Sequence, residues 1–485
     1  MYKKLILGGP GAGKTTRLLE IMDKELSCGL KPYTIAFVSF TKKAVSEARH
    51  RAALKFKLKE KDFLFFRTLH SLCHHQLGIK PDQVMRIEHL REIGNLLGIS
   101  FIGKTSIDDD SGMRDGDKML FLDNLARNVK QDLKDVWQQT DWDLSWHTVE
   151  RFSKTLKAYK KKHGLIDFTD MLQGFVLEGD DIGVKVAIID EAQDLTPLQW
   201  EVADLAFSKV ERLYIAGDDD QAIYEWSGAD INRFLGLGED EREILPYSYR
   251  LPKTIFNEAM TLTKRINKRY KKKLQPRDEL GQVVRCSSLD QIDLTIAGSW
   301  LLLTRNVCFL PILQEACVTQ GISYTMRGSF MSVDSGEVQI IQDYEHLRKG
   351  GVVDEIKGEK ILYYLDQSRD LIPGAYRLAG LVSSDPGIWH DAMTGLTADR
   401  RAYYLTILKA GRKLTGIPKV HLDTIHGVKG GEADHVVLLT DLTRATEEHW
   451  EKNPSAENRV FYVGMTRAKQ NLFLVAPTAD RGFYI

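Results

Sequence analysis

A short segment near the start of the chain carries the residue types that bind phosphate groups. The stretch GGPGAGKT at residues 8–15 fits the pattern G-x-x-x-x-G-K-[ST], with an apolar run before it and a helical pattern after it. Glycines let backbone N–H groups approach phosphate oxygens, and a helix N-terminus adds the positive end of its dipole. Lys14 would then reach the β- and γ-phosphates, and Thr15 would ligate Mg²⁺. The alternative is a plain glycine-rich turn, which the order of strand, loop and helix disfavours. The nucleotide-binding residues expected here are Gly8, Gly9, Pro10, Gly11, Ala12, Gly13, Lys14, Thr15 and Thr16.

Carboxylates close a second apolar run, VAIIDEAQD at residues 186–194. Asp190 stands at the expected strand end, where a carboxylate suits a Mg²⁺ ligand in the second half of a phosphate-loop site. Glu191 would lie beside it and could polarise an attacking water. The alternative is a solvated strand end, which is common for one acidic residue and less so for several that close a buried run.

A third stretch, GDDDQAIYEWSGAD at residues 217–230, mixes several chemistries. Three aspartates precede Gln221, and Tyr224 and Trp226 follow two residues apart. A metal site, an acidic loop and a nucleic-acid contact all fit these residue types. The residues alone leave this choice open.

The elements that must position these residues are short apolar runs bounded by Gly, Asp or Ser. Continuous apolar runs of this length suit strands buried on both faces of a parallel sheet. Helical patterns lie between them, for example at residues 15–26 and 41–55, and this alternation predicts an α/β fold. The runs lie at residues 4–7, 34–40, 63–66, 184–190, 212–218, 300–304, 435–440 and 471–477.

The runs form one set before about residue 220 and another after about residue 300, which predicts two α/β cores. Two polar, helix-like intervals interrupt the alternation and are expected to be insertions. The expected domains are a first core at 1–77 and 163–245, a helical insertion at 78–162, a second core at 246–345 and 415–485, and a small insertion at 346–414.

Composition excludes several classes of protein. The 485 residues include 67 Lys plus Arg and 67 Asp plus Glu, so any basic groove for a polyanion must be local. The five cysteines form no CxxC pair, which argues against a zinc site or a disulfide framework and fits a reducing cytoplasm. The apolar run near the N-terminus is too short for a signal peptide, and no run approaches 18 apolar residues. We expect a cytoplasmic protein without a membrane span.

The ordered motifs resemble those of superfamily 1 helicases of the UvrD, Rep and PcrA type. Each block is weak evidence alone, and their common order from residue 8 to residue 469 is strong. Besides the two motifs above and the stretch at 217–230, the blocks are FTKKAVSEARHR (40–51), RTLHSLC (67–73), DFTDML (167–172), YSYR (247–250), LLTRN (302–306), TIHGVKGGEAD (424–434) and RVFYVGMTRAK (459–469).

This resemblance implies two RecA-like cores that bind ATP and Mg²⁺ between them. Gln221 would sense the γ-phosphate, and Arg250 and Arg467 would act as arginine fingers, since a planar guanidinium pairs phosphate oxygens bidentately. Tyr249 would stack on the base and Glu432 would bind the ribose. Arg17 would line the nucleotide pocket. The implied catalytic set is Lys14, Asp190, Glu191, Gln221, Arg250 and Arg467, with Thr15 and Asp190 as metal ligands.

The resemblance also implies a track for single-stranded DNA. Aromatic rings at Phe40, Tyr224 and Trp226 would hold the bases, and stacking of this kind tolerates any sequence. Without the family, an aromatic pair is more often core and His426 more often structural. Positions expected near the DNA backbone are Thr41, Lys42, His70, Thr424 and His426. The basic run KRINKRYKKK at 264–273 is either a solvated face or a further phosphate contact.

Several positions depart from the family pattern. Only seven residues precede Gly8, so we expect this chain to lack the upstream glutamine that reads adenine in the family. Ser227 stands where an arginine usually follows the tryptophan. Gly431 and Ala433 replace a leucine and a phenylalanine. The second insertion, at about 70 residues, is short for the family, so we expect a compact member.

The resemblance implies an ATP-dependent DNA helicase, a translocase on single-stranded DNA with 3′ to 5′ polarity. Its expected partners are single-stranded DNA, strand junctions and accessory repair, replication or defence proteins, and it is expected to be a monomer. Two alternatives stay open. One is a DNA-stimulated ATPase subunit of a repair or defence nuclease complex, and the other is an ATP switch that binds a protein partner.

Overall fold

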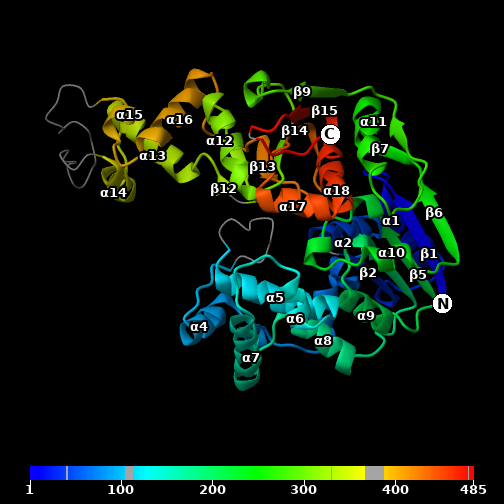
Figure 1. Cartoon of the computed structure of the whole chain (residues 1–485). Helices are drawn as coiled ribbons and strands as arrows, with labels where there is room; N and C mark the ends of the chain where they lie inside the picture. The colour runs from blue at the N-terminus through cyan, green and yellow to red at the C-terminus, as the bar shows by residue number, and fades with distance from the viewer. Residues whose placement is uncertain (40–41, 104–112, 329, 366–386, 479) are drawn as a thin grey trace. The chain divides into compact units, whose positions relative to one another are not determined.

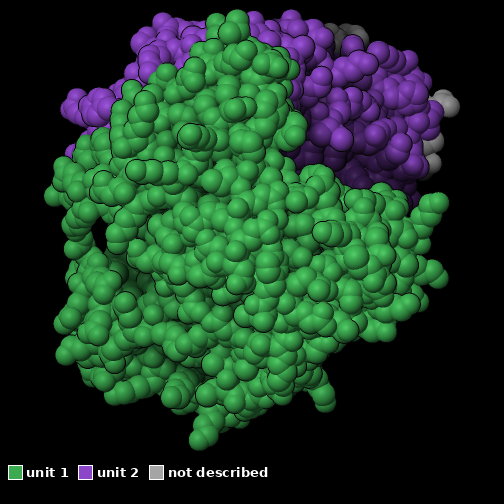
Figure 2. Space-filling view, turned by 90° about the vertical axis from the view of Figure 1, so that its right-hand side faces the viewer, with its two compact units in different colours: residues 1–282, 444–469, 485 green, residues 283–443, 470–484 purple. Residues whose placement is uncertain are grey.

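The computed structural model describes residues 1–485 except 40–41, 104–112, 329, 366–386 and 479. The chain forms two compact units (Figure 2). Unit 1 comprises residues 1–282, 444–469 and 485, and unit 2 comprises residues 283–443 and 470–484. Each unit contains its own sheet (Figure 1).

Unit 1 contains a six-stranded sheet in the order β3-β2-β4-β5-β1-β6, and all of its neighbouring strands are parallel. The carboxyl ends of parallel strands meet at one edge of a sheet, so the loops after β1, β4 and β5 lie next to one another. The strands are β1 (Tyr2–Gly8), β2 (Ile35–Ser39), β3 (Phe65–Arg67), β4 (Val186–Asp190), β5 (Arg212–Gly217) and β6 (Glu241–Leu245).

Helices cover both faces of this sheet, because alternate residues of each buried strand point to opposite sides. Leu5 and Leu7 of β1 belong to the core on one face, whereas Ile6 belongs to the core on the other. The first face packs against α3 (Leu69–Gln76), α8 (Phe168–Glu178) and α9 (Pro197–Ala206). The second face packs against α1 (Lys14–Ser27) and α2 (Lys42–Phe56). The short helix α10 (Ile231–Leu235) completes this part of unit 1.

The first polar interval forms a group of helices with a core of its own (Figure 1). Ser145 and Asp132 cap two of these helices by accepting hydrogen bonds from Thr148 N and Lys134 N. The helices are α4 (Ile87–Leu97), α5 (Asp115–Val129), α6 (Leu133–Gln138) and α7 (Trp146–His163).

The rest of unit 1 comes from two distant parts of the chain. Strand β7 (Tyr247–Pro252) pairs with β8 (Gln275–Arg277), and α11 (Lys253–Thr263) lies between them in sequence. Helices α17 (Arg444–Lys452) and α18 (Pro454–Met465) follow much later in sequence. The almost wholly buried α18 packs on α11 and on the short helix η6 (Asp219–Gln221). This packing is why 246–282 and 444–469 group with the first sheet, a division that differs from the domains expected from sequence.

Unit 2 contains a seven-stranded sheet in the order β12-β11-β13-β10-β14-β15-β9. Strand β10 is parallel to β13 and β14, β11 is parallel to β13, and β12 is antiparallel to β11. The strands are β9 (Gln282–Cys286), β10 (Trp300–Thr304), β11 (Tyr324–Met326), β12 (Phe330–Met331), β13 (Val420–Thr424), β14 (Ala433–Leu439) and β15 (Ala468–Val475). The helices are α12 (Leu310–Thr319), α13 (Ser335–Arg348), α14 (Glu355–Tyr364), α15 (Trp389–Ala392) and α16 (Ala398–Lys409).

Two sheet cores with flanking helices confirm the predicted α/β class with parallel sheets. Within the described residues, every helix is too short or too polar to cross a membrane.

Candidate nucleotide and nucleic-acid site

The glycine-rich loop joins β1 to α1 at the carboxyl edge of the first sheet. Gly13 is the N-cap of α1 and, like Gly11, has a left-handed backbone, with φ of 80° and 68° respectively. A Cβ atom on Gly11 would lie 2.4 Å from the Cβ of Arg250. Glycine is therefore required at residue 11 both by the backbone angle and by the close approach of β7.

Lys14 and Thr15 occupy the first turn of α1. The Lys14 side chain is buried and its Nζ donates to Gly8 O at 3.1 Å. Thr15 Oγ1 donates to Asp190 Oδ2 at 2.9 Å, so two predicted metal ligands lie together. A hydroxyl and a carboxylate are hard oxygen donors of the kind Mg²⁺ binds, and the helix N-terminus favours phosphate. The residues present therefore fit a magnesium-bound nucleotide.

Asp190 is the last residue of β4. Burial, and to a smaller extent the charge of the neighbouring Glu191, raises the pKa of Asp190 to about 6, although Lys14 acts to lower it. Glu191 has a left-handed backbone with φ of 53°, which is uncommon outside glycine and occurs often at functional sites. Gln193 Nε2 donates to Glu191 Oε2 at 2.6 Å, and Gln193 Oε1 accepts from Asp218 N at 3.0 Å. Gln193 thus joins the ends of β4 and β5, a role that sequence analysis missed although the residue stands inside the quoted motif.

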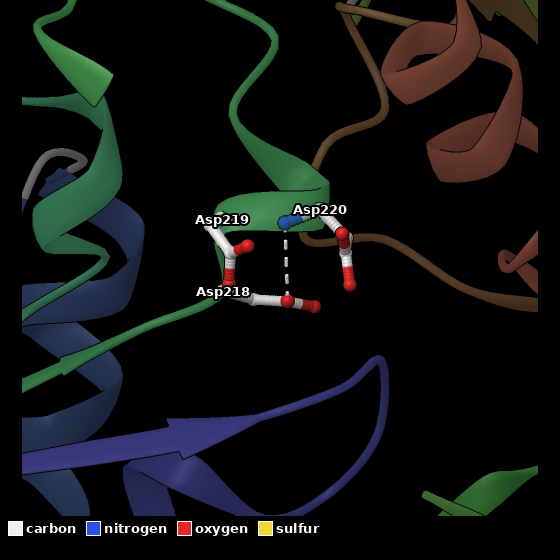
Figure 3. Close-up of side chains that lie close together, drawn as sticks. All are labelled: Asp218, Asp219 and Asp220. Atoms are coloured by element: carbon white, nitrogen blue, oxygen red, sulfur yellow. Dashed lines mark hydrogen bonds between the residues drawn. The ribbon is translucent and has the colours of Figure 1, made fainter. Parts of the chain in front are cut away.

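The three aspartates after β5 lie on and just before η6, with their carboxylates grouped (Figure 3). Acidic groups of this kind could hold a cation. Here Lys272 Nζ lies 2.6 Å from Asp218, 2.5 Å from Asp219 and 2.9 Å from Asp220. Arg269 also binds Asp220 through two nitrogens, at 2.7 and 2.6 Å. The cluster is a buried ion-pair network rather than an open cation site.

This network includes two residues of the basic run 264–273, Arg269 and Lys272. Burial works to lower the pKa of Lys272, but the three carboxylates outweigh it and the pKa lies above its ordinary value. Burial works to raise the pKa of Asp218, but Lys272 and then Lys14 hold it below its ordinary value. Arg269 and Lys272 therefore support the loop that carries Gln221 instead of forming a solvated basic face.

Gln221 is held between the two sides of this site. Its Nε2 donates to Asp218 Oδ2 at 2.6 Å and its Oε1 accepts from Arg467 Nη2 at 2.8 Å. Arg467 follows α18, is buried, and also donates from Nε to Val463 O at 2.9 Å. Arg250 Nη1 lies 3.4 Å from Thr466 O. The structure thus brings the predicted glutamine and both predicted arginines into unit 1.

The residues expected around the base and ribose are more dispersed. Tyr249 is 71% exposed, and its N donates to Gly11 O at 3.0 Å. The Tyr249 ring lies 3.9 Å from the position of a Cβ on Gly13, so it borders the loop. Arg17 pairs with Glu243 at 2.8 Å and with Glu20 at 3.1 Å. A nucleotide would therefore have to compete with two carboxylates for the Arg17 guanidinium.

Aromatic rings continue from the loop into the helical insertion. The centroids of Tyr224 and Trp226 are 6.4 Å apart, and Trp226 stacks on Phe121 at 6.1 Å with an interplanar angle of 21°. Phe121 in turn meets the edge of Trp142 at 5.9 Å. Phe121 was missed from sequence, because an apolar residue in a helical pattern gives no sign of a distant aromatic partner.

His70 lines a small polar cavity of about 210 Å³ next to this loop. Burial lowers its pKa to about 4, and its ring meets Phe168 edge-on at 6.0 Å. At neutral pH the imidazole is therefore uncharged, so a DNA contact would be a hydrogen bond rather than an ion pair. The other lining residues are Ser39, Thr68, Leu69, Asn128, Leu195, Thr196, Gln199 and Ser227.

The remaining predicted contacts lie elsewhere in the chain. Phe40 and Thr41 are outside the described residues, and Lys42 is the first residue of α2. Thr424, His426 and Glu432 belong to unit 2. Thr424 ends β13 and its Oγ1 accepts from Gly427 N at 3.1 Å, and His426 is buried in the turn that follows. Glu432 is exposed just before β14.

Two family models match this chain. The UvrD/REP helicase N-terminal domain matches residues 2–242, and the UvrD-like helicase C-terminal domain matches residues 405–478. The first match contains the whole first sheet apart from the end of β6. The second contains β13, β14 and β15 together with α18 and Arg467.

Curated relatives agree with these matches. They include the ATP-dependent DNA helicase PcrA of Staphylococcus aureus (strain Mu50 / ATCC 700699) and that of Staphylococcus epidermidis (strain ATCC 12228 / FDA PCI 1200). Each is 24% identical over 376 residues, covering 70% of this chain and 51% of the relative. The chain therefore spans about half the length of the curated relatives it matches. Two models of one family, which match residues 2–242 and 405–478, together with the PcrA relatives, mean that the chain belongs to the UvrD-like family of superfamily 1 helicases.

Proposed function

We propose that this protein is an ATP-dependent DNA helicase, a motor that moves 3′ to 5′ along single-stranded DNA and separates duplex strands. One observation carries the proposal. A single short segment holds Gln221 against Arg467 at one end and stacks Trp226 on Phe121 at the other. An ATP site and an aromatic surface for bases are thereby joined by six residues. The names of the relatives, which are DNA helicases, support the choice of DNA.

The nucleotide would be held by residues of the glycine-rich loop and its neighbours. Backbone N–H groups from Gly8 to Thr16 and the Lys14 ammonium would bind the phosphates, and Tyr249 would stack on the base. Mg²⁺, bound by Thr15 and Asp190, supplies charge neutralisation at the phosphate oxygens. Arg17 and, from unit 2, Glu432 remain proposed contacts to the nucleotide.

The chemistry follows from where charge develops during phosphoryl transfer. Glu191, whose carboxylate is fixed by Gln193, would orient the attacking water. Arg250 and Arg467 would stabilise the charge on the transferred phosphoryl group, and such an arginine contributes roughly 10³ to 10⁵ in rate. Gln221 would detect that group and pass its presence along the segment to Trp226.

On the DNA side, Tyr224 and Trp226 would stack on bases, and each stack contributes about 1 to 3 kcal/mol. Phe40 would add a third ring. Hydrogen bonds to the sugar-phosphate backbone would come from Thr41, Lys42, His70, Thr424 and His426. Since the net charge of the chain is zero, any basic groove that adds to this binding must be local.

The proposal is tested by ATP turnover with and without single-stranded oligonucleotides, followed by strand separation on duplexes with a 3′ or a 5′ tail. We expect turnover to rise with single-stranded DNA and the 3′-tailed duplex to be separated. Turnover that ignores DNA would contradict a motor and favour an ATP switch. DNA-stimulated turnover without strand separation would favour a translocating subunit of a larger complex.

Lys14→Ala should abolish ATP turnover and leave binding of single-stranded DNA measurable. The reason is that Lys14 is the buried cation of the phosphate loop, and its hydrogen-bond partner, Gly8 O, belongs to that loop. Turnover and fluorescence anisotropy of a labelled oligonucleotide measure the two properties. Lys24→Ala, in the last turn of the same helix, is the matched control. Strong turnover by Lys14→Ala would refute the site assignment.

A further inference from the structure

Arg459 is a buried cation that the proposed site does not use. It lies in α18 with a relative exposure of 2%, eight residues before Arg467. Its guanidinium donates to three acceptors on three segments of unit 1. Nε donates to Asp219 O at 3.0 Å, Nη1 to Glu225 Oε1 at 2.7 Å, and Nη2 to Lys268 O at 2.9 Å.

Two of these partners lie in the segment that carries Gln221 and Trp226. Asp219 begins η6, which ends at Gln221, and Glu225 begins the short helix η7 (Glu225–Ser227), which contains Trp226. A guanidinium is planar and its donors are fixed relative to one another, so one rigid group sets the separation of η6 and η7. Gln221 therefore lies two residues after Asp219, and Trp226 lies directly after Glu225, and Arg459 holds both of these partners.

Ser227 cannot supply this connection. Its hydroxyl donates to Tyr224 O at 2.9 Å, within the same turn, and carries no charge. The Glu225–Arg459 pair is the charged contact from η7 to α18 among the described residues, and its arginine is almost fully enclosed. Removing one partner of an enclosed pair leaves the other charge uncompensated, so this contact depends on both Glu225 and Arg459.

We infer that Arg459 is a positioning residue that, through Glu225, transmits the state of Gln221 to Trp226 and so couples ATP turnover to the DNA track. This rests on the proposed function, since it names how the two halves of that site communicate. A movement of α18 that shifts Arg467 at Gln221 would also shift Arg459 at Glu225, because both arginines belong to one helix and its end.

The test compares Arg459→Lys and Glu225→Gln with the unmodified chain. Lysine keeps the charge but cannot donate in three fixed directions, and glutamine keeps the shape of Glu225 without its charge. Arg444→Lys and Glu448→Gln are matched controls, because that pair, at 2.7 Å, is exposed on α17 of the same unit. Basal turnover, the stimulation by single-stranded DNA, and the DNA concentration at half-maximal stimulation are measured for each protein.

We expect both test variants to lose about fivefold or more of the DNA stimulation, the lower end of the range for coupling between sites, with basal turnover nearly unchanged. The double variant should lose little more than either single one, because both act on one contact. Loss of basal and stimulated turnover in proportion would mean a purely structural role. Full stimulation in Glu225→Gln would overturn the inference even if Arg459→Lys fails to fold.

A second readout separates this inference from the proposed function. Trp226 emission, taken as the difference between the unmodified chain and Trp226→Phe, is followed while a non-hydrolysable ATP analogue is added without DNA. We expect a change that disappears in Glu225→Gln. If the unmodified enzyme ignores DNA, the proposed function fails, and the emission change still decides the inference. An unchanged response in Glu225→Gln would overturn it.

Discussion

Trp226 has the features of both a core residue and a base-stacking residue, and these two roles predict different effects of its removal. It is half-buried, with one ring contact to Phe121 of the insertion and another to Tyr224. A core tryptophan would stabilise unit 1 and affect every activity equally. A stacking residue would affect only steps that involve DNA, because base stacking is made in the complex alone.

Trp226→Ala should therefore weaken DNA-stimulated turnover more than basal turnover. Loss of about 1 to 3 kcal/mol of stacking per base raises the DNA concentration at half-maximal stimulation by about fivefold to about 150-fold. Trp146→Ala is the control, since that ring packs on Trp137 and not on the track. Titration of turnover with an oligonucleotide gives both values. An equal fall of both activities would assign Trp226 to the core.

The lowered pKa of His70 predicts how the free energy of unfolding depends on pH. Burial lowers its pKa to about 4, below the ordinary 6.5, so as pH falls the unfolded chain binds this proton before the folded one does. The stability linked to His70 is thus fully present above about pH 6.5 and is lost as pH falls toward 4. His70→Gln should lose less free energy of unfolding between about pH 7 and about pH 5 than the unmodified chain. Urea unfolding measures this, with the exposed His147→Gln as control, and equal losses in all three proteins would contradict it.

The chemistry of single residues could be predicted where the chain itself fixes their neighbours. Thr15 and Asp190 begin and end elements at one sheet edge, so spacing and apolar runs sufficed to bring them together. Lys272 and Phe121 could not be found in this way. Their partners, Asp220 and Trp226, reach them through side-chain packing between elements, and no motif or strand end in the sequence marks that packing.

Between elements, an ion-pair network joins the helical insertion to the first sheet. Arg127 of α5 binds Asp167 at 2.8 Å and Asp170 at 2.9 Å, and Lys160 of α7 binds both at 2.6 Å. Asp167 and Asp170 also form the capping box of α8. Burial works to raise the pKa of Asp167, but Arg127 and Lys160 hold it well below its ordinary value.

Arg127→Met should lower the free energy of unfolding at neutral pH by about 3 kcal/mol, because it leaves largely buried carboxylates with fewer partners. The depressed pKa means that this contribution is present above the ordinary pKa of 3.8 and is lost as pH falls through the folded value. Urea unfolding at neutral and acid pH measures both effects. Lys154→Met, which breaks an exposed pair with Glu150, is the control, and an equal cost in both variants would contradict the network's role.

The elements themselves were predicted best where they are buried. Each of the eight apolar runs overlaps a strand of one of the two sheets. Strand β6 was not predicted, because it is an edge strand with the polar sequence EREIL. Strand β13 was not predicted either, because His421 and Asp423 interrupt its apolar pattern, although His421 is satisfied by Thr325 Oγ1 at 2.8 Å on the next strand. A polar side chain that a neighbouring strand accommodates leaves no signal in its own segment.

For the whole molecule, the consequence is that unit 1 is not a continuous piece of chain. Residues 444–469, which contain α18, are separated from the earlier part of unit 1 by residues 283–443 of unit 2. That helix buries apolar residues against α11 and supplies the Arg459 guanidinium that binds Asp219 O. Arg467, just after the helix, binds Gln221 Oε1. The proposed nucleotide site is therefore complete only when residues 444–469 have packed onto the first part of unit 1.

A polypeptide of residues 1–282 should therefore be much less stable alone than when co-expressed with a polypeptide of residues 444–469. Without α18, the apolar side of α11 is exposed and buried acceptors such as Asp219 O lose their donors, at about 1 to 3 kcal/mol for each such group. Thermal unfolding followed by circular dichroism would show a broad, early transition for 1–282 and a sharper, later one for the pair. A 444–469 segment carrying Arg459→Glu and Arg467→Glu is the matched control and should fail to restore it, because it places carboxylates against carboxylates and carbonyls. If 1–282 unfolds at the same temperature with and without the second segment, then α18 is an accessory to unit 1, and the site is formed by the first 282 residues alone.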